Sequence, residues 1–323
     1  MAPDFVGETS FDHAEVPAVG VLFANLGTPD APTRSALRRY LKEFLWDPRV
    51  VEVPRWQWWL ILNGIILNTR PQKSAELYEK VWTDEGSPLL TISRQQASGL
   101  EGRLRERIGN PVHVAVGMRY GNPSIQAALE ELRAKKCRQI LVFPAYPQYS
   151  AVTTGSTFDA VADVLKTWRW VPGLRLVSHY HDHPGYLRAL AGSIRAAWEG
   201  AGPPDKLIFS FHGMPVRYLH DGDPYHCECQ KTGRLLAEEL ELNDDAWTVS
   251  FQSLFGKEEW LRPYTDETLE ALGKGGGSVD VICPGFSADC LETIDEIGRE
   301  NRHVFEEAGG GRYRFIPCLN DDA

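Results

Sequence analysis

Two hydrophobic patterns alternate along this chain. Short runs of β-branched and aromatic residues are followed by longer stretches in which apolar side chains recur every three or four positions. The first pattern predicts buried strands, and the second predicts helices that pack against them. The predicted strands are residues 20–25, 112–116, 140–143, 175–178, 207–211, 248–251 and 279–283. Helical periodicity is clearest over residues 124–135, 186–199 and 231–241.

This alternation predicts an α/β fold, because parallel strands are joined by helices that cover both faces of their sheet. The strands form two sets, so we expect two similar lobes, each a parallel sheet flanked by helices. The boundary is expected near residues 168–173, between an N-terminal lobe of residues 1–170 and a C-terminal lobe of residues 171–323. The first lobe includes an apolar segment at 54–70, and the second carries His212 and an acidic helix over 289–303.

Composition limits the classes of partner. The chain has 323 residues, of which 43% are hydrophobic and 24% charged, as in ordinary globular proteins. Its net charge of −10 argues against nucleic acid as a partner and suits a cationic ligand better. Six cysteines without a signal-peptide pattern indicate reduced thiols and a cytoplasmic location.

The segment 56–67 contains Trp56, Trp58 and Trp59 among isoleucines and leucines. It is too short to span a bilayer of about 30 Å. A buried helix is one interpretation. The alternative is an exposed lip that receives a flat apolar ligand or makes peripheral contact with the inner membrane face. Composition does not separate the two.

Four carboxylates follow the last predicted strand. Asp289, Glu292, Glu296 and Glu300 are spaced by three or four residues, which places them on one face of an α-helix. Like charges on one face repel, so either a cation compensates them or the face is simply solvated. A position just after a strand favours a ligand site, since ligands of open α/β sheets bind at the carboxyl ends of strands.

The other predicted strands also end in polar or aromatic residues. Arg119, Tyr120, Tyr146 and His212 each follow a strand, so they are expected to face a common cleft with Glu292. Neither a dinucleotide fingerprint, a phosphate loop, a hydrolase elbow nor a Cys-x-x-Cys pair is present. What remains is a site for an apolar planar ligand, a base that accepts protons near neutral pH, and carboxylates that bind a cation.

Short motifs over nearly the whole chain resemble the ferrochelatase family, bacterial type. They include Gly117-Met-Arg119-Tyr120, Tyr146-Pro-Gln-Tyr149-Ser150, Phe209-Ser-Phe-His212-Gly-Met-Pro215 and Phe286-Ser-Ala-Asp289-Cys-Leu-Glu292-Thr293. The resemblance implies a lyase that inserts Fe²⁺ into protoporphyrin IX, with release of two protons, at the last step of haem biosynthesis. It also implies two Rossmann-like lobes with the porphyrin cleft between them.

The resemblance also implies roles for individual residues. His212 and Glu292 match the catalytic pair, with His212 as either proton acceptor or iron ligand. The metal and proton path comprises His212, Asp289, Glu292, Glu296 and Glu300. The positions that match porphyrin-binding residues are Leu26, Arg70, Ser87, Arg119, Tyr120, Tyr146, Ser150, Gln252, Ser253, Trp260 and Phe286.

Several positions depart from the animal members of the family. Cys290 replaces a histidine, and Ala151 replaces a ligand of their [2Fe–2S] cluster. A differently placed cluster on Cys227, Cys229, Cys283 and Cys290 is an alternative, but isolated reduced thiols are the expected state. No cofactor is expected beyond the substrate Fe²⁺. The sequence ends where relatives continue into a final helix, so this member lacks that helix or the sequence is truncated.

Other assignments remain open. His179, His181 and His183 match no family motif and are expected to form a solvated surface cluster. A cobalt or nickel chelatase, or a chelatase that puts iron into coproporphyrin, shares the fold and the histidine-plus-acid site. A non-catalytic porphyrin or haem carrier is the alternative from another class, although a carrier needs neither a proton acceptor nor an acidic path. Oligomeric state is not predicted.

Overall fold

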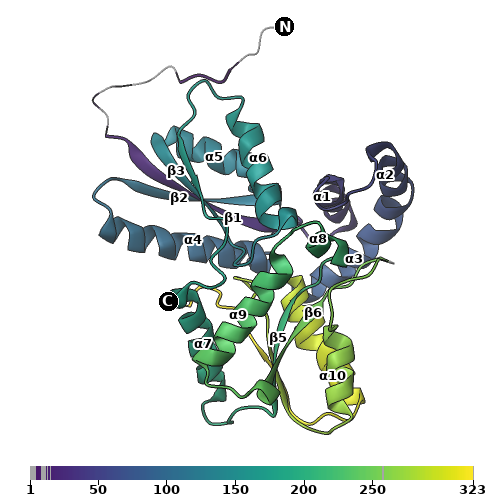
Figure 1. Ribbon diagram of the computed structural model, residues 1–323. Helices are drawn as coiled ribbons and strands as arrows, with labels where there is room; N and C mark the ends of the chain where they lie inside the picture. The colour runs from purple at the N-terminus through teal and green to yellow at the C-terminus, as the bar shows by residue number, and fades with distance from the viewer. Residues whose placement is uncertain (1–4, 9–11, 13, 15, 257, 323) are drawn as a thin grey trace. The chain divides into compact units, whose positions relative to one another are not determined.

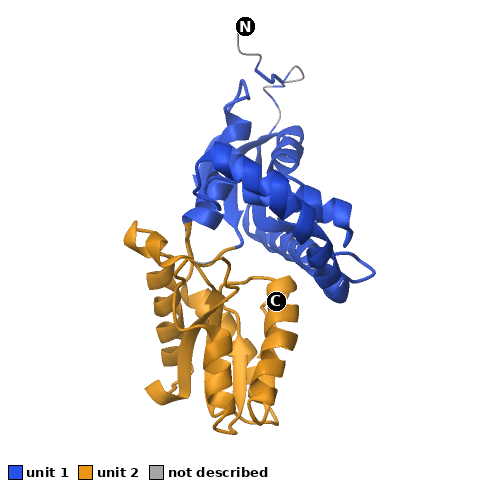
Figure 2. Cartoon of the chain, turned by 90° about the vertical axis from the view of Figure 1, so that its right-hand side faces the viewer, with its two compact units in different colours: residues 1–145, 151–178, 323 blue, residues 146–150, 179–322 orange. Residues whose placement is uncertain are grey.

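The computed structural model describes residues 5–8, 12, 14, 16–256 and 258–322. These form two compact units, which Figure 2 colours separately. Unit 1 comprises residues up to 145 together with 151–178, and unit 2 comprises residues 146–150 and 179–322. A short segment between two parts of unit 1 therefore belongs to unit 2.

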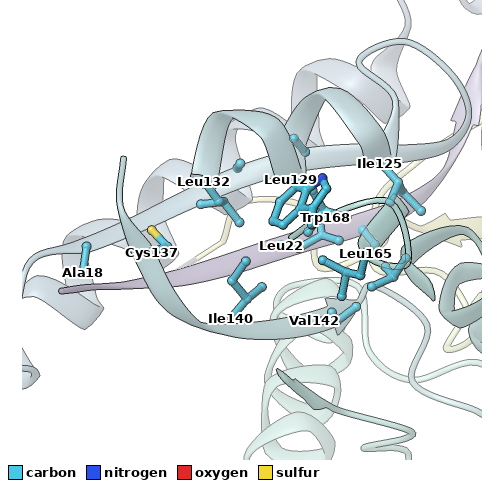
Figure 3. Close-up of a cluster of buried hydrophobic side chains, with 14 residues drawn as sticks. Ala18, Leu22, Ile125, Leu129, Leu132, Cys137, Ile140, Val142, Leu165 and Trp168 are labelled. Atoms are coloured by element: carbon cyan, nitrogen blue, oxygen red, sulfur yellow. The ribbon is translucent and has the colours of Figure 1, made fainter. Parts of the chain in front are cut away.

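Unit 1 contains a parallel sheet of four strands in the order β2-β1-β3-β4. The strands are β1 (Ala18–Thr28), β2 (Val112–Gly121), β3 (Cys137–Pro144) and β4 (Gly173–Leu176). Successive side chains of β1 point to opposite faces. Leu22 packs under α5 (Ile125–Ala134) and α6 (Ser156–Leu165), as Figure 3 shows. Phe23 packs on the other face, with Ala97 of α4 (Pro88–Arg107).

A separate helical layer of unit 1 contains the apolar segment. The helices are α1 (Arg34–Trp46), α2 (Arg55–Ile61), a π-helical turn (Leu62–Ile66) and α3 (Leu67–Val81). Trp58 is buried with Leu62 and Leu67, while Trp56 and Trp59 are 68% and 54% exposed. One side of this segment is therefore buried and the other exposed, and contact of the exposed side with a flat ligand or a membrane stays a prediction. Among the described residues, every helix is too short or too polar to cross a membrane.

Unit 2 repeats the strand order, as β6-β5-β7-β8, again with parallel pairing. Its strands are β5 (Lys206–His212), β6 (Trp247–Gln252), β7 (Val279–Ile282) and β8 (Tyr313–Ile316). The helices labelled in Figure 1 are α7 (Pro184–Trp198), α8 (Val216–His220), α9 (Tyr225–Glu239) and α10 (Thr265–Gly273). A long π-helix (Glu292–Asn301) continues into α11 (Arg302–Glu307). Ile297 and Phe305 from these last helices fill the core against β7.

The predicted fold class is confirmed, since each unit is a parallel sheet flanked by helices. The structure differs from the prediction in two strands. β4 lies two residues earlier than the predicted 175–178. β8 was not predicted, because its four residues include Arg314 and follow a glycine-rich turn, which leaves too short an apolar run to recognise.

Candidate active site

His212 is the last residue of β5. It pairs in register with Gln252, the last residue of β6, so the carboxyl ends of both strands lie at one edge of the unit 2 sheet. Nδ1 of His212 lies 2.7 Å from the carbonyl oxygen of Gly213. When the ring is neutral, this contact places the proton on Nδ1 and leaves Nε2 with a free lone pair. His212 is therefore oriented to accept a proton or to bind a metal through Nε2.

The turn after His212 depends on a glycine. A Cβ atom at Gly213 would lie 2.8 Å from the carbonyl oxygen of Gln252 and 3.1 Å from the ring of Trp260. The amide of Gly213 donates to that same carbonyl at 2.7 Å. The absence of a side chain lets the backbone approach both neighbours. Trp260, a predicted porphyrin contact, consequently lies beside the residue that follows the histidine.

Ser253 follows β6 with a left-handed backbone, at φ +64°. In this conformation its amide donates to Oε1 of Glu296 at 2.7 Å, and its hydroxyl donates to Oε2 of the same carboxylate. The preceding Gln252 is buried and donates through Nε2 to the backbone carbonyl of Glu292 at 3.4 Å. The two predicted polar residues at the end of β6, Gln252 and Ser253, thus hold the helix that carries the acids.

That helix is not the predicted α-helix over 289–303. It is a π-helix from Glu292 to Asn301, and Asp289 precedes it. The prediction that four carboxylates share one α-helical face is therefore wrong. Helices of this kind are rare, and they occur most often at functional sites. Glu292, Glu296 and Glu300 remain on the helix, each four residues from the next.

Asp289 has structural partners. Its Oδ1 accepts from the hydroxyl of Thr293 at 2.9 Å and from the amide of Cys318 at 3.3 Å, and its Oδ2 accepts from the side-chain amide of Asn320 at 2.8 Å. These bonds tie the start of the π-helix to the end of the chain. Asp289 therefore has a structural role in this structure, and its assignment as a metal ligand stays a prediction.

The three helical glutamates have different surroundings. Burial raises the pKa of Glu296 above its ordinary value, and the charge of Glu292 raises it further, while Ser253 and His212 partly oppose the shift. Glu300 is exposed and lies 3.4 Å from Arg299, which also pairs with Asp295. Arg299 therefore compensates the outer end of the row. The inner end places His212 and Glu292 close enough to Glu296 to shift its pKa.

Other predicted porphyrin residues of unit 2 lie beside this edge in the fold. Tyr146 is buried, and Ser150 donates through its hydroxyl to Asp223 at 3.0 Å. Phe286 packs against the core between β7 and the π-helix. The hydroxyl of Tyr225 donates to the carbonyl of His212 at 3.0 Å, so the start of α9 supports the end of β5.

In unit 1, Arg119 and Tyr120 belong to a buried polar network. Arg119 pairs with Asp47 at 2.5 Å and donates through Nε to Ser156. The hydroxyl of Tyr120 also donates to Asp47, at 2.8 Å. Burial raises the pKa of Asp47, but the hydroxyls of Ser156 and Tyr120, the amide of Arg49 and the charge of Arg119 lower it more, so the net shift is downward. Asp47 is an anion whose charge is fully compensated.

A hollow of about 660 Å³ adjoins this network within unit 1. Its apolar lining includes Trp46, Trp59 and Leu62, and its basic lining comprises Arg39, Lys42 and Arg119. Glu43 and Asp47 line it as well, so three cations stand beside two carboxylates. Aromatic side chains beside an excess of cations suit a flat apolar molecule that carries carboxylates. The hollow therefore joins the exposed side of the tryptophan segment to a predicted porphyrin residue.

The remaining predicted residues of unit 1 lie elsewhere in its layers. Leu26 packs with the core cluster that contains Tyr120. Ser87 is buried at the start of α4, and its oxygen accepts from the hydroxyl of Thr28 at 2.8 Å. Arg70 is exposed on α3. Their assignment to porphyrin binding stays a prediction.

The expected surface cluster of histidines is wrong in one respect. His179 and His183 are exposed, but His181 is 4% exposed, and Glu228 and Thr232 of α9 both contact it. The cysteines show a mixed picture: Cys227 is exposed, while Cys229, Cys283 and Cys290 are buried with pKa values raised by burial. Among the described residues, the thiols of these four do not form a group with ligand-like spacing.

Sequence reasoning missed Asp47 and Glu228. Asp47 precedes a proline at the end of α1, and nothing local indicates that Arg119 and Tyr120 approach it from a distant strand. Glu228 lies in the His226-Cys-Glu-Cys229 run, which drew attention for its cysteines. Glu228 is flanked by one exposed and one buried cysteine, so the local sequence carried no signal that its carboxylate is buried.

Comparisons with known proteins agree with this geometry. A family model described as Ferrochelatase matches residues 18–323. A ferrochelatase of Thioalkalivibrio sulfidiphilus is 63% identical over 319 residues, covering 98% of this chain and 86% of that protein. One of Nitrosococcus oceani is 56% identical over 321 residues, covering 99% and 87%.

Among solved structures, SirB from Bacillus subtilis with Fe³⁺ matches with a TM-score of 0.55 at 12% identity, covering 95% of this chain and 90% of that one. At this identity the likeness concerns the fold alone, and it agrees with the two α/β units. The resemblance inferred from the motifs is confirmed by the family model and by the relatives over nearly their full length. The chain belongs to the ferrochelatase family.

Proposed function

We propose that this chain inserts Fe²⁺ into protoporphyrin IX with release of two protons, as its family membership implies. The observation that carries the proposal is the edge of the unit 2 sheet. There an imidazole with a free Nε2 lies near Glu296, a carboxylate whose pKa is raised by burial. Such an edge offers proton acceptors and anionic ligands together, which is what metal insertion needs.

The chemistry is a proton-for-metal exchange. Protoporphyrin loses the hydrogens of two pyrrole nitrogens, and Fe²⁺ takes their place with no change of oxidation state. His212 accepts a pyrrole proton at Nε2 or binds the iron there, and both roles use the orientation fixed by the Gly213 carbonyl. Glu292 and Glu296 carry the balancing charge, as ligands of the metal or as proton carriers.

The raised pKa of Glu296 suits this task. A carboxylate that holds its proton more strongly than an ordinary glutamate exchanges protons closer to neutral pH. Ser253 keeps both carboxylate oxygens hydrogen-bonded while this happens. Glu300, which is exposed and paired with Arg299, provides the outer end of an acidic path towards water.

Porphyrin binding is assigned to residues of both units. In unit 1, the aromatic hollow with Arg39, Lys42 and Arg119 supplies apolar contact and cations for propionate groups. In unit 2, Tyr146, Trp260 and Phe286 supply further aromatic surface. Arg70 and Ser87 are proposed for the propionate side, and Leu26 for the apolar wall. We propose that Fe²⁺ acts as a substrate of this chain and that no resident cofactor is required.

The test is anaerobic incubation of the purified chain with Fe²⁺ and protoporphyrin IX, followed by loss of porphyrin fluorescence and gain of haem absorbance. His212→Ala and Glu292→Gln are each expected to lower the rate about a hundredfold or more. His303→Ala is the matched control, because this exposed histidine pairs with Glu307 away from the strand ends. Haem formation at the parent rate in both variants would contradict the proposal.

Further arms separate the alternatives. Coproporphyrin in place of protoporphyrin tests the porphyrin preference, and Co²⁺ or Ni²⁺ in place of Fe²⁺ tests the metal. Tight porphyrin binding by the parent without insertion of any of these metals would leave the carrier function in place of the lyase.

We also propose peripheral membrane contact through the exposed side of α2 and the π-turn after it. Trp56, Trp59 and Ile65 are 68%, 54% and 60% exposed there. Exposed tryptophans beside aliphatic residues favour the lipid interface. The variant Trp56→Ser/Trp59→Ser is expected to bind liposomes more weakly, with Phe158→Ser as the matched exposed control. Trp58 is unsuitable, because it is buried and donates to the carbonyl of Leu45. Unchanged binding would remove the proposal.

A further inference from the structure

Two histidines and a glutamate of unit 2 converge outside the set of predicted site residues. His179 and His181 lie in the segment between β4 and α7, and Glu228 lies in the first turn of α9. Nδ1 of His179 is 2.7 Å from Oε1 of Glu228, and Nδ1 of His181 is 3.2 Å from Oε2. One ligand atom from each residue falls within 4.8 Å of the others. This spacing is that of atoms that share one metal ion.

His181 is the unusual member of the group. It is 4% exposed, and its Nδ1 makes no well-directed hydrogen bond despite its approach to Glu228. A buried ring nitrogen without a hydrogen bond is costly unless it has another partner. Its Nε2 faces Oδ2 of Asp182 at 3.9 Å. This distance is too long for a hydrogen bond, and the same carboxylate oxygen pairs with Lys231 at 2.5 Å.

The surroundings of Glu228 favour its ionised form. Burial raises its pKa, but the two histidines and the amide of Tyr149 lower it more, so the net shift is downward. The Tyr149 amide donates to Oε2 at 2.7 Å. An ionised carboxylate fixed between two imidazoles, only one of which is exposed, supplies the charge that a divalent cation needs.

We propose that His179, His181 and Glu228 form a metal site that binds one divalent transition-metal ion, Zn²⁺ or Fe²⁺, through two imidazole Nδ1 atoms and one carboxylate oxygen. Two histidines with one carboxylate is a donor set that suits both ions, and it leaves coordination positions open for water. None of these ligands belongs to the residues proposed for porphyrin metallation. The site therefore goes beyond the proposed function.

The site would connect three parts of unit 2. Glu228 already holds the amide of Tyr149, in the 146–150 segment that also carries the predicted porphyrin residues Tyr146 and Ser150. Gln148 in the same segment donates to Thr232 of α9 at 3.0 Å. A bound ion would also join the segment that carries His179 and His181 to α9. It would thereby stabilise the contacts among this segment, α9 and residues 146–150.

The first test is crystallography of the full chain soaked in Zn²⁺, and separately in Fe²⁺ without oxygen. An anomalous difference peak between the two Nδ1 atoms and the Glu228 carboxylate is expected with at least one of the ions. This readout locates the ion and does not depend on haem formation, so a failure of the proposed lyase activity leaves it intact.

The second test is Zn²⁺ and Fe²⁺ titration calorimetry on His179→Ala, with His303→Ala as the matched control. His179 is half exposed, so the variant removes a ligand without opening the core. The affinity of this site is expected to fall at least about tenfold, since even losing an outer partner of a metal ligand costs that much. His212→Ala should retain it. The absence of a peak with both ions, or equal affinity in His179→Ala and the parent, would overturn the proposal and leave a hydrogen-bond network.

Discussion

Unit 1 and unit 2 share one strand order, yet each treats its buried carboxylate differently. Asp47 in unit 1 meets Arg119, Tyr120 and Ser156, and its pKa is lowered. Glu296 in unit 2 meets the amide and hydroxyl of Ser253 and the charge of Glu292, and its pKa is raised. In unit 1, the Asp47 carboxylate is an anion paired with a guanidinium group and hydroxyl donors. Unit 2 holds a carboxylate that lacks a guanidinium partner among the described residues.

The contrast shows that two units with the same strand order can hold carboxylates in chemically different environments. The strands beside these networks occupy the same place in both sheets: Tyr120 lies near the end of β2, Ser253 follows β6, and each of these two strands is an edge strand of its sheet. What differs is the residue type after the strand and the helix that faces it. We infer that unit 1 is built to bind and unit 2 to exchange protons and metal, and four predictions test that division.

The largest effect is expected from Asp47→Ala. This change leaves the Arg119 guanidinium, 18% exposed, without its carboxylate, and a broken buried pair costs about 3–5 kcal/mol. Urea denaturation measures the loss. Asp30→Ala, which breaks an exposed pair with Arg39, is the control and should cost less than about 1 kcal/mol. If both variants lost the same free energy of unfolding, the buried pair of Asp47 and Arg119 would contribute no more than an exposed ion pair.

Ser253→Ala should slow haem formation about tenfold at neutral pH and lower the free energy of unfolding by about 1.5–3 kcal/mol, since it removes one hydrogen bond to a charged group. Without the hydroxyl, the anionic form of Glu296 loses a donor, so the acidic limb of the pH–rate profile should move to higher pH. Initial rates from pH 5 to pH 9 measure the shift. An unmoved profile would mean that Glu296 does not titrate in the rate-limiting step.

The pH dependence of stability should have opposite signs in the two units. The lowered pKa of Asp47 contributes stability above its unfolded value, and this is lost as pH falls through the folded value. The raised pKa of Glu296 contributes stability below its unfolded value, and this is lost as pH rises through the folded value. Glu296→Gln should therefore gain stability relative to the parent as pH rises, and Asp47→Asn should lose it. Urea denaturation of the parent and both variants at several pH values measures these differences. The comparison would be contradicted if the stability of both variants relative to the parent changed with pH in the same direction.

The smallest effect is expected from Glu300→Gln. This glutamate is exposed and its pair with Arg299 spans 3.4 Å, so the change should cost less than about 0.5 kcal/mol in unfolding experiments. Haem formation should fall less than in Glu292→Gln, because the outer end of the row is already open to water. A loss as large as that of Glu292→Gln would place the rate-limiting step at the outer end.

The sequence predicted the strands and helices well, because their hydrophobic periods report directly which side chains are buried. It also singled out His212 and Ser253, through motifs at predicted strand ends, and Glu296, through the spacing of the carboxylates; their roles stay predictions. It did not predict the π-helix, because the i→i+5 hydrogen bonds of such a helix correspond to no distinctive residue pattern in a short acidic sequence. The burial of His181 and the pairing of Asp47 depend on segments far apart in the chain, which no local pattern describes.

The π-helix from Glu292 to Asn301 makes this site sensitive to chain length as well as to residue type. Deleting one residue inside it would let the backbone return to ordinary α-helical winding. Every residue beyond the deletion would then turn by about 100°. The anchor between the Tyr313 hydroxyl and the Ile297 carbonyl and the row of glutamates could no longer both be kept. Homologues should therefore tolerate exchanges in this helix more readily than a change in its number of residues.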